Sequence, residues 1–215
     1  DAVDRIIGGL EKKNKIITPK EKRTIAYHEA GHASVSWLLE HANPLVKVTI
    51  VPRGQALGAA WYLPEERQIT TKAQLLDQMI SLLGGRASEE IVFGEVSTGA
   101  LNDLERVTKQ AYAMVVYYGL DKEIGNISFY DSSGQSEYGF QKPFSDKTAE
   151  KIDAQIRSMV EEAYNKAKAI LTENREKLDA LATILVEREV IFREDVENIY
   201  GKRPWDEEKA DEQQA

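Results

Sequence analysis

The sequence contains no cysteine, and this absence excludes several kinds of site. Disulfides, iron–sulfur clusters, cysteine-ligated zinc and thiol nucleophiles are all impossible, so a metal ion would have to be held by histidine, aspartate or glutamate. The absence also fits a reducing compartment. With 215 residues and 42% hydrophobic content, the chain can still bury a core large enough for one domain without disulfides.

Long apolar runs and an excess of positive charge are also absent. No stretch approaches the ~20 apolar residues that a membrane-spanning helix needs, and the chain opens with no signal peptide. The net charge is −8, which argues against nucleic-acid binding because phosphate contacts need clustered cations. From these absences we expect a soluble piece of protein that binds no nucleic acid.

Most of the sequence has the apolar spacing of helices. Thr18 followed by Pro19 and Glu21 is a helix-start signal, and it predicts a helix from Thr18 to about Ala42 that buries one apolar stripe. A helix from Thr70 is expected to be interrupted at Gly84-Gly85. Further helices are predicted at 97–119, 145–171, 173–187 and 193–200, and strands at 46–52 and 56–63. The pattern therefore predicts a mainly α fold with a small β-sheet inserted after the first helix and a C-terminal helical bundle.

The stretch "HEAGH" at 28–32 suggests a metal site on the first helix. His28 and His32 lie one turn apart on the same face, so both imidazoles can reach one Zn²⁺ at ~2.0–2.1 Å. Glu29 is rotated about 100° from His28 and lies beside the metal, where it could take a proton from a zinc-bound water. Gly31 costs roughly 1 kcal/mol of helix stability, and one use for it is close packing by a neighbouring segment. The alternative is two partly buried histidines with ordinary hydrogen bonds.

A zinc enzyme needs a third protein ligand, and the neighbouring residues do not supply one. A metzincin site would require glycine at 35 and histidine at 38, where this chain has Val35 and Leu38. His41 lies a quarter-turn off the face of the other two and is interpreted as a surface residue near the helix end.

Carboxylates are the remaining candidates for the third ligand. Glu89 and Glu90 stand in "GGRASEEIVFG", and Asp103 stands in "STGALNDLERVT". Asp103 falls in the first turn of a predicted helix, where the helix dipole favours an anion, although an aspartate there often serves only as a cap. The residues alone leave the choice open.

Five segments, in order, carry a family resemblance. They are "GLEKKNKIITPKEKRTIAYHEAGHA", "LGAAWYLPEER", "LLGGRASEEIVFGEVSTGALNDLERVTKQAYAMVVYYG", "DKTAEKIDAQIRSMVEEAYNKAKAIL" and "LVEREVIFREDVENIYGKRP". Nearly the whole chain thereby resembles the peptidase domain of the FtsH family of ATP-dependent, membrane-anchored AAA+ zinc proteases. So many ordered matches are far more specific than the five-residue motif alone.

The resemblance implies the site and its chemistry. One zinc per subunit would be bound by His28, His32 and Asp103, the last from the family's "TGAxNDL" element, with Glu29 as general base. Glu89 and Glu90 would then have supporting or packing roles near the site. The strand containing Gly58, Ala59 and Ala60 corresponds to the strand beside the family's cleft, where a peptide could add by main-chain hydrogen bonds. Plain sheet packing is the alternative for that strand.

The resemblance also implies that this chain is part of a longer protein that forms an oligomeric assembly. Residues 1–16 look like the end of an ATPase module or linker, 17–205 like the zinc peptidase domain, and 206–215 like a disordered acidic tail. No G-x-x-x-x-G-K-[ST] phosphate loop occurs, so ATP would act only through a missing ATPase module. The family implies a ring of six, with the C-terminal helices and their "EREVIFRED" connection as candidate subunit contacts. Its substrates would be unfolded or membrane proteins. The full protein would be anchored by a missing N-terminal segment in a bacterial inner membrane or a derived organelle membrane, with this domain on the cytoplasmic or matrix side.

A different class of function is a non-catalytic helical assembly module in which the histidines are structural. Glu29 argues against it, because a purely structural site has no need of a general base.

Overall fold

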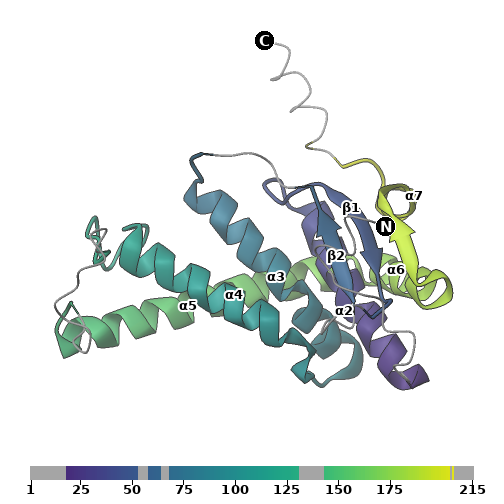
Figure 1. Ribbon diagram of the computed structural model, residues 1–215, viewed down its shortest axis with the longest axis horizontal. Coiled ribbons are helices and arrows are strands. Elements are labelled where there is room, and N and C mark those ends of the chain that lie inside the picture. Colours follow the sequence, from purple (N-terminus) through teal and green to yellow (C-terminus); the bar gives the residue numbers. More distant parts are fainter. Residues whose placement is uncertain (1–17, 53–57, 64–67, 131–142, 204, 206–215) are drawn as a thin grey trace, which may run out of the picture.

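The computed structural model describes residues 18–52, 58–63, 68–130, 143–203 and 205. Within them the chain is mainly helical with one small sheet, as the sequence predicts (Figure 1). The elements in chain order are α2 (Pro19–Leu38), β1 (Leu45–Thr49), β2 (Ala59–Tyr62), α3 (Lys72–Phe93), η1 (Thr98–Ala100), α4 (Leu101–Tyr112), η2 (Ala113–Tyr117), α5 (Asp146–Glu173), α6 (Arg175–Arg188), β3 (Val190–Phe192) and α7 (Arg193–Tyr200). The predicted ATPase end at 1–16 and the predicted tail at 206–215 lie outside the described residues, as do residues 131–142 between η2 and α5.

Helix α2 begins as predicted and lies at the centre of the fold. The Thr18 hydroxyl accepts the Glu21 N–H at 3.2 Å, and the Glu21 carboxylate accepts the Thr18 N–H at 2.9 Å, which is a capping box. Every residue from 26 to 37 is buried. The predicted single stripe is therefore wrong, because α3, α5, α6 and the sheet cover this helix on all sides.

Helix α2 ends at Leu38, before the predicted end at Ala42. The buried guanidinium of Arg203 donates to the carbonyl oxygens of Leu39 at 2.8 Å and Ala42 at 2.5 Å. These bonds satisfy carbonyl groups that follow the last helical turn. A segment from the other end of the chain thus stabilises the end of the helix.

The predicted interruption of α3 at Gly84-Gly85 is wrong. The helix is continuous past both glycines. A Cβ at Gly84 would lie 2.7 Å from the carbonyl oxygen of Gly31 on α2, so the two helices cross with their backbones in contact. This contact confirms that Gly31 permits close packing by a neighbouring segment. The glycines lower helix propensity but bring together two helices that carry candidate site residues.

The sheet is antiparallel, with the strand order β2–β1–β3. β1 and β2 are the two predicted strands in shorter form. The sequence does not predict β3, because residues 188–192 are interpreted as a connection and three residues are too few for alternation to be visible. Ile191 of β3 is buried opposite Val48 of β1. Within the described residues β2 is an edge strand, with one side paired only to β1.

The later helices follow their predicted positions closely. η1 and α4 replace the start of the predicted helix at 97–119, and a π-helical turn, η2, completes it. Gly119 follows with φ +60°, the left-handed conformation expected after a helix end. The Ser145 hydroxyl caps α5 by accepting the Thr148 N–H at 3.3 Å. α4 and one end of α5 extend away from the sheet (Figure 1).

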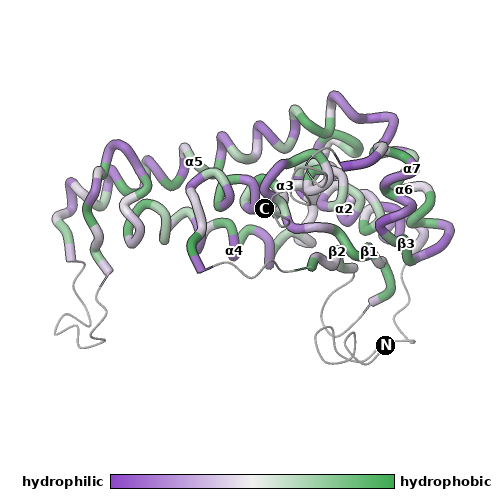
Figure 2. Tube along the Cα trace, turned by 90° about the horizontal axis from the view of Figure 1, so that it is seen from above, coloured by the Kyte–Doolittle hydropathy of each residue, from purple (hydrophilic) through white to green (hydrophobic). Residues whose placement is uncertain are grey.

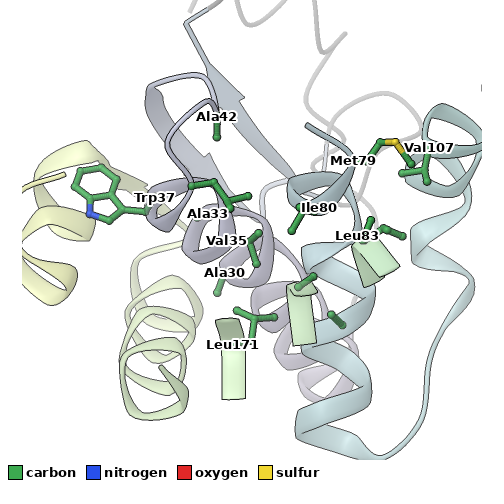
Figure 3. Packing of buried hydrophobic residues seen from close by; sticks show 14 of the residues in the cluster. Ala30, Ala33, Val35, Trp37, Ala42, Met79, Ile80, Leu83, Val107 and Leu171 are labelled. Carbon is green, nitrogen blue, oxygen red and sulfur yellow. The ribbon is translucent and has the colours of Figure 1, made fainter. Parts of the chain in front are cut away.

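The core lies where α2 meets α3, α5 and α6. Figure 3 shows Ala30 and Val35 of α2 in one cluster with Leu83 of α3 and Leu171 of α5, all of them almost completely buried. Figure 2 shows apolar and polar residues alternating along α5, as expected for a helix that packs along one face. Among the described helices, none combines the length and the apolar character needed to cross a membrane.

Candidate metal centre

The two histidines of α2 turn the same ring nitrogen toward a common point. Their Nε2 atoms lie 3.1 Å apart, and both residues are buried. Nδ1 of His32 lies 2.9 Å from the carbonyl oxygen of Ser81 on α3, and Nδ1 of His28 lies 2.6 Å from a carboxylate oxygen of Glu89. Because each Nδ1 faces an acceptor, we assign the hydrogen of each neutral ring to Nδ1, so that the lone pair of each neutral ring is on Nε2 and can bind a metal ion.

Asp103 completes a group of three ligating side chains. It stands in the first turn of α4, where its anion is favoured, and its Oδ2 lies 3.4 Å from Nε2 of both His28 and His32. The three ligand atoms all lie within 4.8 Å of one another. The structure thus brings together the two histidines and one of the three carboxylates that the sequence leaves as candidates.

The spacing and chemistry of this group fit zinc. A tetrahedral zinc ion with bonds of ~2.0–2.1 Å holds its ligand atoms about 3.3–3.4 Å apart. The separations here are 3.1 Å between the nitrogens and 3.4 Å from each nitrogen to the carboxylate oxygen. Two imidazoles and one carboxylate are also a donor set that zinc accepts, and three protein ligands leave a fourth position for water. His28, His32 and Asp103 could therefore hold zinc with little rearrangement.

Glu89 and Glu90 have different surroundings although they are adjacent. Glu89 is buried on α3, where one carboxylate oxygen meets Nδ1 of His28 and the other accepts the backbone N–H of Ser97 at 2.6 Å. It thereby links the first histidine to the turn that leads into α4. Glu90 instead bonds with Tyr164 and Lys168 of α5. Only Glu89 contacts a residue of the three-ligand group.

We expect Glu89→Gln to lower zinc affinity by ~10–100-fold, because outer partners of this kind orient and polarise a ligating histidine. Competition with a chromophoric chelator would measure the affinity. Glu90→Gln makes the same chemical change one residue away and should leave zinc affinity within about twofold. Equal losses in the two variants would contradict the assigned role of Glu89.

The carboxylates around the histidines shift the proton affinities within the group. Burial lowers the pKa of His28, but hydrogen bonds with Asp103 and Glu89 outweigh it and raise the pKa from 6.5 to about 10. Burial raises the pKa of Asp103, yet hydrogen bonds with both histidines bring it well below its ordinary value. Asp103 is thus an anion at neutral pH. Binding of a cation would displace a proton from His28.

Gly85 leaves room for both histidine rings. A Cβ at this position would lie 2.5 Å from Nε2 of His28 and 2.6 Å from Nε2 of His32. Any side chain at 85 would therefore collide with the two nitrogens that face Asp103. Sequence reasoning missed this role, although a glycine pair inside a long helical pattern was a signal of close approach.

Glu29 lies beside the three-ligand group and is buried. Its carboxylate rests against the backbone of residue 58, since a Cβ at Gly58 would lie 2.7 Å from both Cγ and Oε1 of Glu29. Burial raises the pKa of Glu29, and the neighbouring histidines only partly oppose that shift. A buried carboxylate with a raised pKa is suited to accept and hold a proton.

The other predicted site residues lie on β2 or beyond α2. Ala59 and Ala60 are half-buried on the edge strand and pair with Thr49 and Val48 of β1. Gly58 lies directly before β2 and faces the side chain of Glu29. His41 lies in the turn after α2, and its backbone N–H donates to Asp77. It is not part of the three-ligand group.

Comparison with known proteins shows the family of the chain. Residues 15–199 match the model of peptidase family M41. The ATP-dependent zinc metalloprotease FtsH of Parabacteroides distasonis is 64% identical over 95% of this chain and 30% of its own length. The FtsH of Rhodothermus marinus is 54% identical over 95% and 30% of the two chains. The mitochondrial inner membrane m-AAA protease component AFG3L2 of Mus musculus is 48% identical over 99% and 26%. This chain thus spans less than a third of these relatives, and it belongs to peptidase family M41.

Proposed function

We propose that this chain is the zinc endopeptidase domain of a membrane-anchored, ATP-dependent protease. His28, His32 and Asp103 hold one zinc ion per chain, and Glu29 is the general base. The observation that carries this proposal is the set of three ligand atoms at zinc-compatible separations, with the buried Glu29 carboxylate beside them. The names of the relatives, which are zinc metalloproteases, support the same assignment.

The chain's own residues account for the proton transfers of peptide hydrolysis. When bound, zinc would act as a Lewis acid and lower the pKa of water to about 7. Glu29 accepts a proton from the attacking water and delivers it to the leaving amine. The Glu29 carboxylate suits this role because it is buried, lies next to a ligand in the sequence and belongs to none of the three ligand positions. Glu89 keeps the His28 ring oriented through Nδ1.

Peptide binding at the open edge of β2 suits substrates that are unfolded or extracted from a membrane. A peptide in extended conformation would add to Ala59 and Ala60 as a further strand through main-chain hydrogen bonds. Such bonds are independent of side-chain identity, so they tolerate many sequences. They also require an extended segment, which a folded protein rarely exposes.

The remaining parts of the whole protein lie outside residues 17–205, which form the peptidase domain. We place the end of an ATPase module at 1–16 and an acidic tail at 206–215. ATP would act only through that module, and a ring of six subunits would enclose the sites. Relatives named as ATP-dependent or as mitochondrial inner membrane proteins support this placement. The protein would be anchored in a bacterial inner membrane or a derived organelle membrane, with this domain on the cytoplasmic or matrix side.

Zinc content and chelator sensitivity test the proposal. The purified chain is expected to hold one zinc ion, to cleave an unfolded protein such as reduced casein, and to lose this activity in 1,10-phenanthroline and regain it on zinc addition. Metal analysis and peptide release would measure both properties. A chain that binds no zinc and cleaves nothing would support the non-catalytic assembly module, and a chain that cleaves equally with and without chelator would exclude zinc catalysis.

A further inference from the structure

Gly58 and Glu29 form a contact whose role goes beyond peptide docking. Gly58 directly precedes β2, and a Cβ at this position would lie 2.7 Å from both Cγ and Oε1 of Glu29 and 3.0 Å from Cδ. These distances are below any normal contact between non-bonded heavy atoms. The Glu29 carboxylate therefore occupies the space that a side chain at 58 would fill.

We infer that Gly58 is a positioning residue that fixes the direction of the Glu29 carboxylate. The backbone at residue 58 forms one wall of the space in which this carboxylate lies, and the absence of a side chain there leaves room for it. The position of the strand therefore limits the directions in which the Glu29 carboxylate can point. The inference rests on the proposed function, because it takes Glu29 to be the general base. It differs from peptide binding by Gly58, which would act on substrate affinity instead.

The strand next to Gly58 is hydrogen-bonded to β1 and to α2, and these bonds oppose its displacement by a new side chain. Ala59 and Ala60 pair with β1, and the Leu63 N–H donates to the carbonyl of Pro44 at 2.9 Å. β2 is also tied directly to α2, because the Tyr62 hydroxyl lies 2.9 Å from the Ser36 hydroxyl. Ser36 in turn bonds at 2.6 Å to the carbonyl oxygen of His32. Hydrogen bonds through Ser36 thus link the strand to the histidine helix.

The nature of the contacted atoms predicts which property a substitution changes. At Gly84 a Cβ would meet the backbone of Gly31, so the two helices would have to separate and the fold would lose stability. At Gly58 a Cβ would meet Cγ, Cδ and Oε1 of Glu29, which are side-chain atoms that move when the side chain changes rotamer. A methyl group at 58 should therefore turn the Glu29 carboxylate away and leave the fold intact. A displacement of about 1 Å at a reacting group can cost ~10²-fold in rate.

A double-mutant cycle tests the inference in the zinc-loaded 215-residue chain. Gly58→Ala is expected to lower kcat by ~10²-fold and to leave KM within about twofold, with zinc content and Tm close to those of the parent. Glu29→Ala removes Cγ, Cδ and both carboxylate oxygens, so it should reduce kcat and remove the collision. The double variant should then be no slower than Glu29→Ala alone. A crystal structure of Gly58→Ala, even without metal, should show the Glu29 carboxylate displaced.

Several results would overturn the inference. Losses that multiply in the double variant would show that the two residues act independently. A rise in KM at unchanged kcat would assign Gly58 to peptide binding, and an unmoved Glu29 carboxylate in the variant crystal would exclude the steric effect. Glu29→Gln separates the two hypotheses. If Glu29→Gln is inactive and Gly58→Ala is as fast as the parent, only the positioning role fails. If Glu29→Gln stays active, the proposed function fails first.

Discussion

Replacing Glu29 with glutamine is expected to lower kcat/KM for an unfolded protein substrate by ~10²–10⁴-fold, the range that general base catalysis contributes. The amide has nearly the shape of the carboxylate but cannot accept the proton of the attacking water. Zinc should remain at one ion per chain, because Glu29 is not among the three ligand residues. Peptide release and metal analysis on the same preparation would measure both quantities.

Glu105→Gln is the matched control for this experiment. Glu105 is an exposed residue of α4 that pairs with Lys109 one turn later, so the same chemical change there should leave activity and zinc content unaltered. Full activity of the Glu29→Gln variant would show that Glu29 is not the general base. Loss of zinc from that variant would instead assign the residue to metal binding.

The second large effect is expected at Gly85, where one methyl group should lower zinc affinity by at least ~10²-fold, more than the loss expected on removing an outer partner. The new Cβ would lie within 2.6 Å of both Nε2 atoms, so the rings must rotate apart and the ligand triangle opens. Helix propensity alone would favour alanine by about 1 kcal/mol. Reduced zinc affinity together with a folded, helical chain would therefore be the specific result. Chelator competition and circular dichroism would measure the two properties.

Gly94→Ala provides the opposite pattern. Gly94 ends α3 with φ +70°, and a Cβ there would meet nothing within 4 Å. Alanine at this position should lower Tm because the left-handed conformation is strained for it, and zinc affinity should not change. If Gly85→Ala binds zinc as tightly as the parent, the histidine rings have room that the structure does not show.

Features that depend on local chemistry could be predicted from the sequence. The helix starts at Thr18 and Ser145 could both be predicted, because the residues that form each cap stand three positions apart in the sequence. The one-turn spacing of His28 and His32 is local in the same sense. The position at which α2 ends could not be predicted from the sequence, because Arg203 and the carbonyl groups it binds are more than 160 residues apart in the chain.

The choice among the candidate carboxylates needed the three-dimensional structure for a related reason. Glu89 and Asp103 both approach His28, but Glu89 meets Nδ1 and Asp103 meets Nε2. The packing of α3 and the start of α4 against α2 determines which ring nitrogen each carboxylate contacts. This packing cannot be predicted from the spacing of residues in the sequence. The contact of Gly85 with the histidine rings could not be predicted for the same reason, because glycine within a helical pattern normally indicates only lower helix stability.

The Arg203 contacts have a consequence for the order in which the protein is made. A ribosome produces α2, α3 and Asp103 early, yet the residue that closes the carbonyl end of α2 emerges about 160 residues after that helix. Until then the polypeptide already carries His28, Glu29 and His32, but the helix that holds them lacks its final restraint. The end of α2 is therefore fixed only when synthesis of residues 18–203 is almost finished.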